Sequence, residues 1–258
     1  MQTHTPKLYV EINKSNYIFA VCLNKEHQGL EIIEKLIISN KSINNNKLVD
    51  LVEASKVIKT NIEIIENKLN YIFKDVIVTI DNFDYTCINI SGFKKLNGSQ
   101  VLKENISYIL NSLKLTISEN IKEKTILHIF NSKSILDGSI IENLPIGLFG
   151  DFYSHELSFL LIKNNDLKNI KQIFNKNSLN VKKVLIKKFI EGTQLINTNQ
   201  NIKTFFKIDI NKENTSIIFF DNSSFVYKED FNFGTNILRD DIAKICSINS
   251  NFIESILL

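Results

Sequence analysis

The sequence predicts an α/β fold into which a smaller α+β unit is inserted. Three observations predict it: apolar residues alternate through the first 38 residues, their period changes between residues 47 and 73, and the run 75–81 is apolar on both faces. Alternation is typical of half-buried strands, a period of three to four residues is typical of a helix, and a fully apolar run fits a covered strand. Strand, long helix and strand in this order predict an α/β layer.

The first unit begins with two strands joined by a polar break at residues 13–16, Asn-Lys-Ser-Asn. Because Asn tolerates positive φ, we expect a tight hairpin there. An Asn-rich loop follows the third strand at 40–46. The strands expected in this unit lie at 8–12, 17–23, 30–38 and 75–81, and the long helix runs from Lys47 to about Phe73.

The inserted unit has the order strand, helix, strand, strand. A polar connection is expected from Gly92 to Gly98, and Ser99 can cap the helix because its hydroxyl can accept a hydrogen bond from the first turn. The elements expected here are a strand at 85–90, a helix at 99–115 and strands at 125–135 and 153–163.

After residue 163 the chain returns to the α/β pattern and then forms new hairpins. Thr235 is expected to cap a last helix. The polar break near residue 212 is similar to the break near residue 13, which suggests an internal duplication. The elements expected here are a helix from Asp166, a strand at 181–186, a helix at 189–195 and strands at 205–210, 215–220 and 225–233.

Composition narrows the class of protein. The 258 residues are 43% hydrophobic and 23% charged, which is enough to build a core. The net charge is +3 and Arg239 is the only arginine, so nucleic-acid binding is not expected. No run approaches the ~18 apolar residues of a membrane-spanning helix. Three widely separated cysteines fit a reducing compartment, and we expect a cytoplasmic protein.

Four stretches carry a family resemblance. The most specific is 127–150, which ends in Asn-Leu-Pro-Ile-Gly-Leu-Phe-Gly and contains Pro145, Gly147 and Gly150; the others are Glu53-Ala54, 207–215 and 233–243. Together they resemble the FtsA family of bacterial actin-like cell-division proteins. The resemblance implies an actin-like (ribonuclease-H-like) α/β domain, an inserted α+β subdomain of the family's 1C type, and the beginning of a second actin-like domain.

The resemblance also implies domain limits: 1–83 and 164–200 form domain 1A, 84–163 the inserted 1C subdomain, and 201–258 part of domain 2A. Members of the family continue into the FtsZ-binding 2B region and a membrane-anchoring helix, and both are expected to be absent here. The terminal residues Phe252, Ile253, Ile256 and Leu257 form a short amphipathic stretch without flanking lysines.

In the resembled family, two hairpin loops hold the phosphates of ATP and its Mg²⁺ through glycine-rich backbone amides. Here Asn replaces glycine in both loops, and Glu213 adds a negative charge that repels a phosphate by ~1–4 kcal/mol at ~4 Å. We therefore expect ATP binding to be weak or lost, with no hydrolysis and no catalytic residue. The degenerate cofactor-binding positions are Asn13, Lys14, Ser15, Asp209, Thr215 and Gly234.

The remaining polar residues predict neither a metal site nor a nucleophile. Asp209 is either a strand-end turn residue or a remaining Mg²⁺ ligand, and a lone carboxylate favours the first reading. His128 and His155 lack metal-ligand spacing to another His or Cys. No segment has the pattern of a nucleophile elbow.

The family resemblance implies a non-enzymatic cell-division scaffold. It would act through the inserted subdomain, by self-association and by contact with other division proteins, and its partners would hold it at the cytoplasmic face of the inner membrane. Three alternatives remain: a PilM-like scaffold of type IV pilus assembly that binds a short peptide, an enzyme of the sugar-kinase or Hsp70 type, and a decayed or split FtsA gene. The altered phosphate loops disfavour the enzyme.

Overall fold

The computed structural model describes residues 5–25, 29–44, 47–81, 83–199, 201–249 and 253, so most of the terminal stretch around Phe252 lies outside the described residues. The first sheet has the strand order β11-β6-β1-β2-β3. β1, β2 and β3 are antiparallel, whereas β6 and β11 extend the sheet in parallel. The bounds are β1 Lys7–Ile12, β2 Asn16–Lys25, β3 Gly29–Ser39, β6 Asp75–Ile80 and β11 Asn180–Ile186.

Two helices, α1 (Leu51–Leu69) and α3 (Asn164–Asn175), pack against each other and share one core with this sheet. The predicted start of α1 at Lys47 was wrong. Asp50 accepts hydrogen bonds from the amides of Val52 (3.0 Å) and Glu53 (2.9 Å) and fixes the start at Leu51. The preceding residues pair instead as two short strands, β4 (Ile43–Asn44) and β5 (Lys47–Leu48).

The inserted unit is a four-stranded sheet with one helix, α2 (Lys103–Asn120). The predicted connection at 92–98 was wrong over its first half, because β7 pairs with β10 along its whole length and places Gly92 opposite His155. The predicted cap at Ser99 was also wrong: Asn105 Oδ1 accepts from the amide of Leu102 at 2.7 Å instead. The strands are β7 Tyr85–Lys95, β8 Lys124–Leu136, β9 Ser139–Ile141 and β10 Phe152–Lys163.

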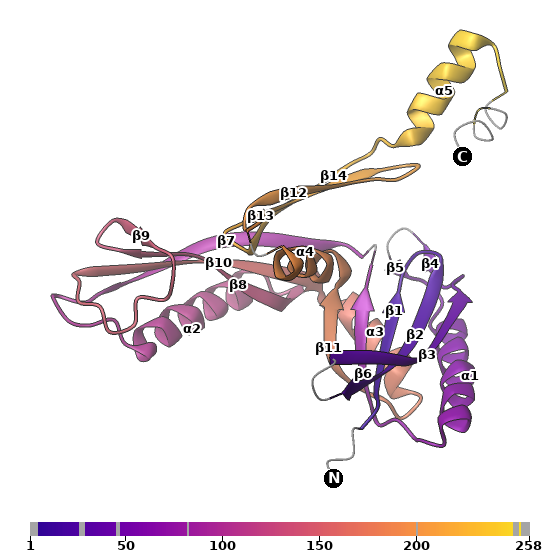
Figure 1. Cartoon of the computed structure of the whole chain (residues 1–258), viewed down its shortest axis with the longest axis horizontal. Helices are drawn as coiled ribbons and strands as arrows, with labels where there is room; N and C mark the ends of the chain where they lie inside the picture. The colour runs from indigo at the N-terminus through magenta and orange to yellow at the C-terminus, as the bar shows by residue number, and fades with distance from the viewer. Residues whose placement is uncertain are drawn as a thin grey trace.

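The third sheet is antiparallel and consists of β12 (Phe205–Ile210), β13 (Thr215–Asp221) and β14 (Ser224–Phe231). Helix α4 (Lys187–Thr198) connects the first sheet to it, and α5 (Thr235–Cys246) follows β14 and extends past the end of the sheet (Figure 1). Gly234 occupies the N-cap position, so the predicted cap at Thr235 was one residue late.

The internal duplication suggested by the two polar breaks is visible in the hairpins. The Asn13 amide donates to Asn16 O at 3.0 Å, and the Asn211 amide donates to Asn214 O at 2.8 Å. The expected reason for Asn was wrong, because no residue at 13–16 or 211–214 has positive φ. The asparagine side chains hydrogen-bond within their own turns instead, as in an Asx turn.

One hydrophobic core runs from the first sheet, α1 and α3 to the inner side of the third sheet, where it includes Ile218, Phe220 and Phe225. A second core lies between α2 and the sheet of the inserted unit. Among the helices that the structure describes, none combines the length and the apolar character needed to span a membrane.

Candidate functional site

The candidate site lies where the β1–β2 hairpin meets the β12–β13 hairpin. Lys14 Nζ of the first lies 3.2 Å from Glu213 Oε2 of the second, and both side chains are more than half exposed. An exposed ion pair of this kind adds only ~0–1 kcal/mol to stability. The pair is of interest because of where it lies. It spans the gap between the two hairpins that the resembled family uses for phosphates.

Asn13 occupies two backbone amides of the first hairpin. Its Oδ1 accepts from the Ser15 amide at 3.0 Å and from the Asn16 amide at 2.7 Å, while its Nδ2 donates to Glu11 Oε1 at 3.0 Å. A hydrogen that is bonded to a side chain is no longer free to bind a phosphate oxygen. The first hairpin is therefore closed by its own asparagine.

The second hairpin binds the start of α5. The amides of Thr235 and Asn236 donate to Asn211 O and Lys212 O, both at 3.0 Å. Thr215, another predicted cofactor position, is buried and donates its hydroxyl to Phe233 O at 2.9 Å. Its side chain thus holds the segment that leads to α5 and does not face an open site.

Gly234 is the residue that allows this close contact. A Cβ at this position would lie 2.2 Å from Asn211 O and 2.5 Å from Lys212 O, and backbone atoms yield little. We expect Gly234→Ala to lower the free energy of unfolding by about 1–3 kcal/mol and to raise amide hydrogen exchange at the start of α5. The matched control is Asn232→Ala at an exposed neighbouring position, and equal effects of the two changes would contradict this role.

Glu11 and Asp209 precede the two hairpin asparagines by two residues, and each is paired with a lysine at the start of α4. Lys187 Nζ lies 2.7 Å from Glu11 Oε1, and Lys188 Nζ lies 2.7 Å from Asp209 Oδ2. Positive charges in the first turn of a helix interact unfavourably with the helix dipole. Glu11 and Asp209 compensate for this by pairing with Lys187 and Lys188. Through this pair of ion pairs, which we call the lysine clamp, α4 joins the two duplicated units.

The environment of Asp209 is that of an ion pair. Lys207 Nζ lies 2.9 Å from Asp209 Oδ1 and also contacts Glu191. Burial alone would raise the pKa of Asp209, but the hydrogen bonds and charges of Lys188 and Lys207 outweigh it, so this pKa lies below its ordinary value. Burial would lower the pKa of Lys207, and its two carboxylate partners raise it instead. Both oxygens of Asp209 are therefore engaged by ammonium groups.

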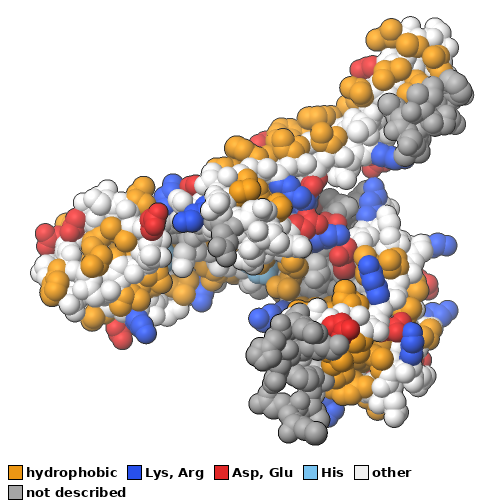
Figure 2. Space-filling view, viewed as in Figure 1, with side chains coloured by type: hydrophobic (Ala, Val, Ile, Leu, Met, Phe, Trp, Pro, Cys, Tyr) orange, Lys and Arg blue, Asp and Glu red, His pale blue; other side chains and the backbone are white. Residues whose placement is uncertain are grey.

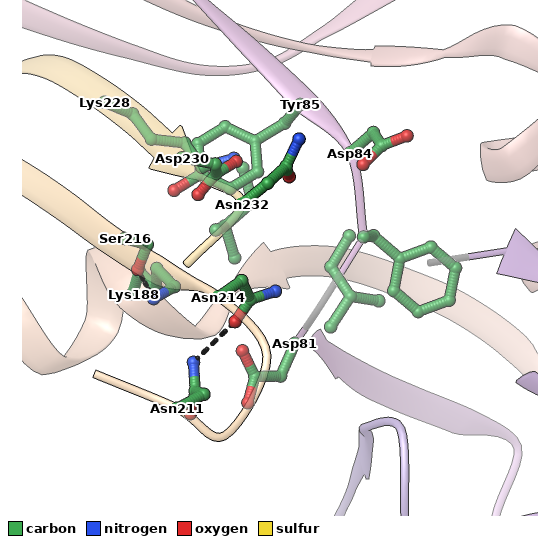
Figure 3. A pocket seen from close by; sticks show the side chains of 13 residues that line it. Asp81, Asp84, Tyr85, Lys188, Asn211, Asn214, Ser216, Lys228, Asp230 and Asn232 are labelled. Carbon is green, nitrogen blue, oxygen red and sulfur yellow. Dashed lines mark hydrogen bonds and ion pairs between the residues drawn. The ribbon is translucent and has the colours of Figure 1, made fainter. Parts of the chain in front are cut away.

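A cavity of ≈ 240 Å³ lies beside the second hairpin. Figure 3 shows Asn211 hydrogen-bonded to Asn214 at the end of the hairpin, with Asp81 nearby. The charged residues lining it are Asp81, Asp84, Lys188, Lys228 and Asp230. Carboxylates are the ligands that Mg²⁺ prefers, but both oxygens of Asp209, the carboxylate at the predicted cofactor position, are already paired with Lys188 and Lys207. The residues present therefore do not fit the triphosphate and Mg²⁺ of ATP at this position. In the described part of the chain, no group of three or more His, Cys, Asp and Glu could hold a metal ion.

The predicted interaction loop, with Pro145, Gly147 and Gly150, lies in the inserted unit near β9 and apart from the hairpins (Figure 1). The Gly147 amide donates to Val101 O at 2.8 Å, and Gly147 has a φ of +88°, which favours glycine. Pro145 O accepts from the Leu148 amide, and the Gly150 amide donates to Ser99 O. The exposed apolar side chains of this loop are Leu144, Ile146, Leu148 and Phe149.

A second cavity, of ≈ 420 Å³, lies between β8 and β11 and is lined by residues 125–128, Leu167, Lys171 and 181–185. We call it the β8–β11 groove. Within the described residues β11 is the outer strand of the first sheet, and its Ile186 amide donates to His128 Nε2 at 3.3 Å. His128 also packs against Phe130 and Phe189.

Burial lowers the pKa of His128 to about 4. The unfolded chain binds this proton below pH ~6.5, so stability falls as pH drops from about 6.5 towards 4. We expect His128→Gln, which keeps an acceptor for Ile186, to reduce that fall by about 2 kcal/mol after allowance for partial exposure. Urea unfolding between pH 7 and 4.5 measures it, and identical pH profiles for wild type and variant would contradict the assignment.

Sequence reasoning did not identify Lys187 and Lys188, or the partner role of Glu191. The one available signal was the Lys-Lys pair directly after the strand 181–186, at the place where parallel strands end and sites gather. The structure brings Asn13, Lys14, Ser15, Asp209, Thr215 and Gly234 to the two hairpins and their supports.

No protein-family model and no curated protein matches the sequence. Solved structures do match. A chain of the PilM–PilN type IV pilus biogenesis complex is 10% identical, with a TM-score of 0.62, and the match covers 98% of this chain and 69% of that chain. The ethanolamine utilization protein EutJ from Carboxydothermus hydrogenoformans is 10% identical, with a TM-score of 0.46, and 98% of this chain and 61% of that chain are covered.

MreB5 of Spiroplasma citri bound to ADP is 10% identical, with a TM-score of 0.40, and the match covers 95% of this chain and 57% of that chain. The chain thus spans about 57–69% of the length of these three proteins. The expected actin-like fold with mixed α/β content is confirmed, and the likeness to the PilM–PilN chain carries that conclusion. The narrower resemblance to the FtsA family stays a prediction.

Proposed function

We propose that this chain is a non-enzymatic, PilM-like scaffold that binds an extended segment of a partner protein in place of a nucleotide. Two observations carry the proposal: Asn13 holds the amides of Ser15 and Asn16 in the first hairpin, and Lys14 and Glu213 span the gap to the second hairpin. The fold similarity to a chain of the PilM–PilN complex supports the same reading. A membrane-bound partner would hold the chain at the cytoplasmic face of the inner membrane.

The β8–β11 groove is the proposed binding site for the partner segment. The outer edge of β11 can accept a further strand through backbone hydrogen bonds, which is a common mode of peptide recognition. The groove also carries Lys171, Lys182 and Lys183. These lysines favour a segment with acidic residues, because opposite charges steer association and set its register.

The test uses fluorescent peptides that tile the cytoplasmic segments of proteins encoded beside this gene. At least one peptide is expected to bind with micromolar affinity, and the double change Lys171→Glu/Lys183→Glu is expected to weaken it at least about tenfold by charge reversal. The control is Lys59→Glu on α1, because Lys59 is exposed like Lys171 and Lys183 but lies outside the groove. The proposal is contradicted if no peptide binds, or if the double change does not weaken the affinity for the peptide.

A second candidate is the FtsA-like division scaffold with its partners at the inserted unit. The observation in its favour is the group of exposed apolar side chains in the interaction loop, which includes Phe149 at 69% exposure. Exposed apolar groups of this kind mark interaction surfaces. Recovery of division proteins by the full chain, lost on Phe149→Glu, supports this candidate, and recovery of none counts against it.

A further inference from the structure

The outer face of the third sheet is mostly apolar and, in the described part of the chain, largely exposed. Phe206, Ile208 and Ile210 of β12 are 66%, 56% and 63% exposed, and Figure 2 shows hydrophobic side chains along this sheet and again on α5. The strand register places further apolar residues on the same face, together with Glu229, which is hydrogen-bonded to the hydroxyl of Tyr227. We call the following set the outer face: Phe206, Ile208, Ile210, Ile217, Phe219, Tyr227 and Phe231.

The internal duplication shows what covers such a face. Aligning the hairpins at Asn13 and Asn211 makes Ile12 equivalent to Ile210, and Val10 equivalent to Ile208. Ile12 and Val10 are fully buried in the core that contains the apolar sides of α1 and α3. The same positions are thus closed by helices in the first unit and open in the second.

Helix α5 is the counterpart of α1, because each is the first helix after the three antiparallel strands of its unit. In α5, however, no described residue is buried. Leu238, Ile242 and Ile245 recur at helical spacing as one stripe, with Leu238 65% and Ile245 83% exposed. The twelve residues of α5 span ~18 Å, close to the ~20 Å of a six-residue strand such as β12.

The contacts at the start of α5 direct it away from its own sheet. The amides of Thr235 and Asn236 are bonded to the second hairpin, with Gly234 packed against the same carbonyls. From there α5 continues beyond the end of the strands (Figure 1). Held in this position, α5 has no buried residue and its stripe does not cover its own outer face (Figure 1). The stripe is therefore available to the outer face of another molecule.

We propose that two copies of this chain form a symmetric dimer in which each outer face binds the α5 stripe of the other copy. The contact is isologous, since each copy gives one helix and receives one. The contact would bury the exposed apolar side chains of the outer face and of the α5 stripe, which include Phe206, Ile208 and Leu238; a standard interface buries ~800 Å² per partner. This inference is independent of the proposed partner groove.

The test is the molar mass of the full chain in sedimentation equilibrium between low and high micromolar concentrations. Wild type is expected to be dimeric at the upper end. Ile208→Lys on the outer face and Leu238→Glu on α5 are each expected to raise the dimer dissociation constant at least about a hundredfold, because each buries an unpaired charge. The matched control is Ile37→Lys, which is also 56% exposed on an outer strand, β3, and is expected to leave the dimer unchanged.

Two results overturn the proposal. One is a wild-type chain that stays monomeric over the whole range. The other is a dimer that persists in both Ile208→Lys and Leu238→Glu, which would place the contact elsewhere. Because Ile208 and Leu238 are both exposed, circular dichroism is expected to show the wild-type fold in each variant. The two changes lie on different elements, so the test still works if one variant does not fold.

Discussion

Replacing Phe220 with alanine is expected to lower the free energy of unfolding by about 3–5 kcal/mol. Phe220 is fully buried, its ring stacks on Phe205 at 4.9 Å between centroids, and it meets Phe225 edge-on at 5.3 Å. Gly192 of α4 lies against the same ring and has no side chain to fill the space that the ring would leave. Urea denaturation followed by circular dichroism measures the loss.

The change at Phe220 also tests whether the third sheet shares the core of the first, as the continuous cluster of buried residues indicates. Phe93→Ala is the control, because Phe93 is 73% exposed on β7 and its removal is expected to change stability by less than about 0.5 kcal/mol. Comparable losses at Phe93 and Phe220 would show that the third sheet is not packed as described.

Asp209→Ala is expected to cost about 2–3 kcal/mol, because it leaves Lys188 and Lys207 partly buried without their shared carboxylate. The effect should depend on pH. Since the pKa of Asp209 lies below its ordinary value, the carboxylate stabilises the fold above pH ~4 and loses this contribution as the pH falls further. Wild type and variant should therefore converge in acid.

Glu213→Ala is the matched control for Asp209→Ala. Glu213 also pairs with a lysine, but its side chain is 72% exposed, so the change is expected to cost less than about 0.5 kcal/mol. A variant of Asp209 that is as stable as this control at pH 7 would show that the lysine clamp contributes nothing to joining the two units.

The sequence predicted the order of strands and helices well because periodicity reports which faces are buried. The starts of helices were less predictable, since they depend on single hydrogen bonds. Asp50 determines where α1 begins, and Asn105 does so for α2, although Ser99 had the more usual capping side chain. The length of β7 was missed for a similar reason: its pairing with β10 extends through the glycine that indicated a loop.

At the candidate site, sequence reasoning located the two hairpins and the substitution of glycine by Asn. The role of Asn13 was not predictable, because its side chain bonds the turn instead of allowing a left-handed residue. The lysine clamp was missed since Lys187 and Glu11 are 176 residues apart. Residues so far apart in the sequence come into contact only when the two sheets pack on α4. No local sequence pattern indicates such a contact.

The central claim is that the phosphate cradle of the actin-like fold is closed by side chains in this protein. Calorimetric titration of the purified chain with MgATP tests it most directly. No binding heat is expected up to about 1 mM nucleotide, because Asn13 holds the amides and Lys14 and Glu213 span the gap. Saturable binding of MgATP in the micromolar range would contradict the account.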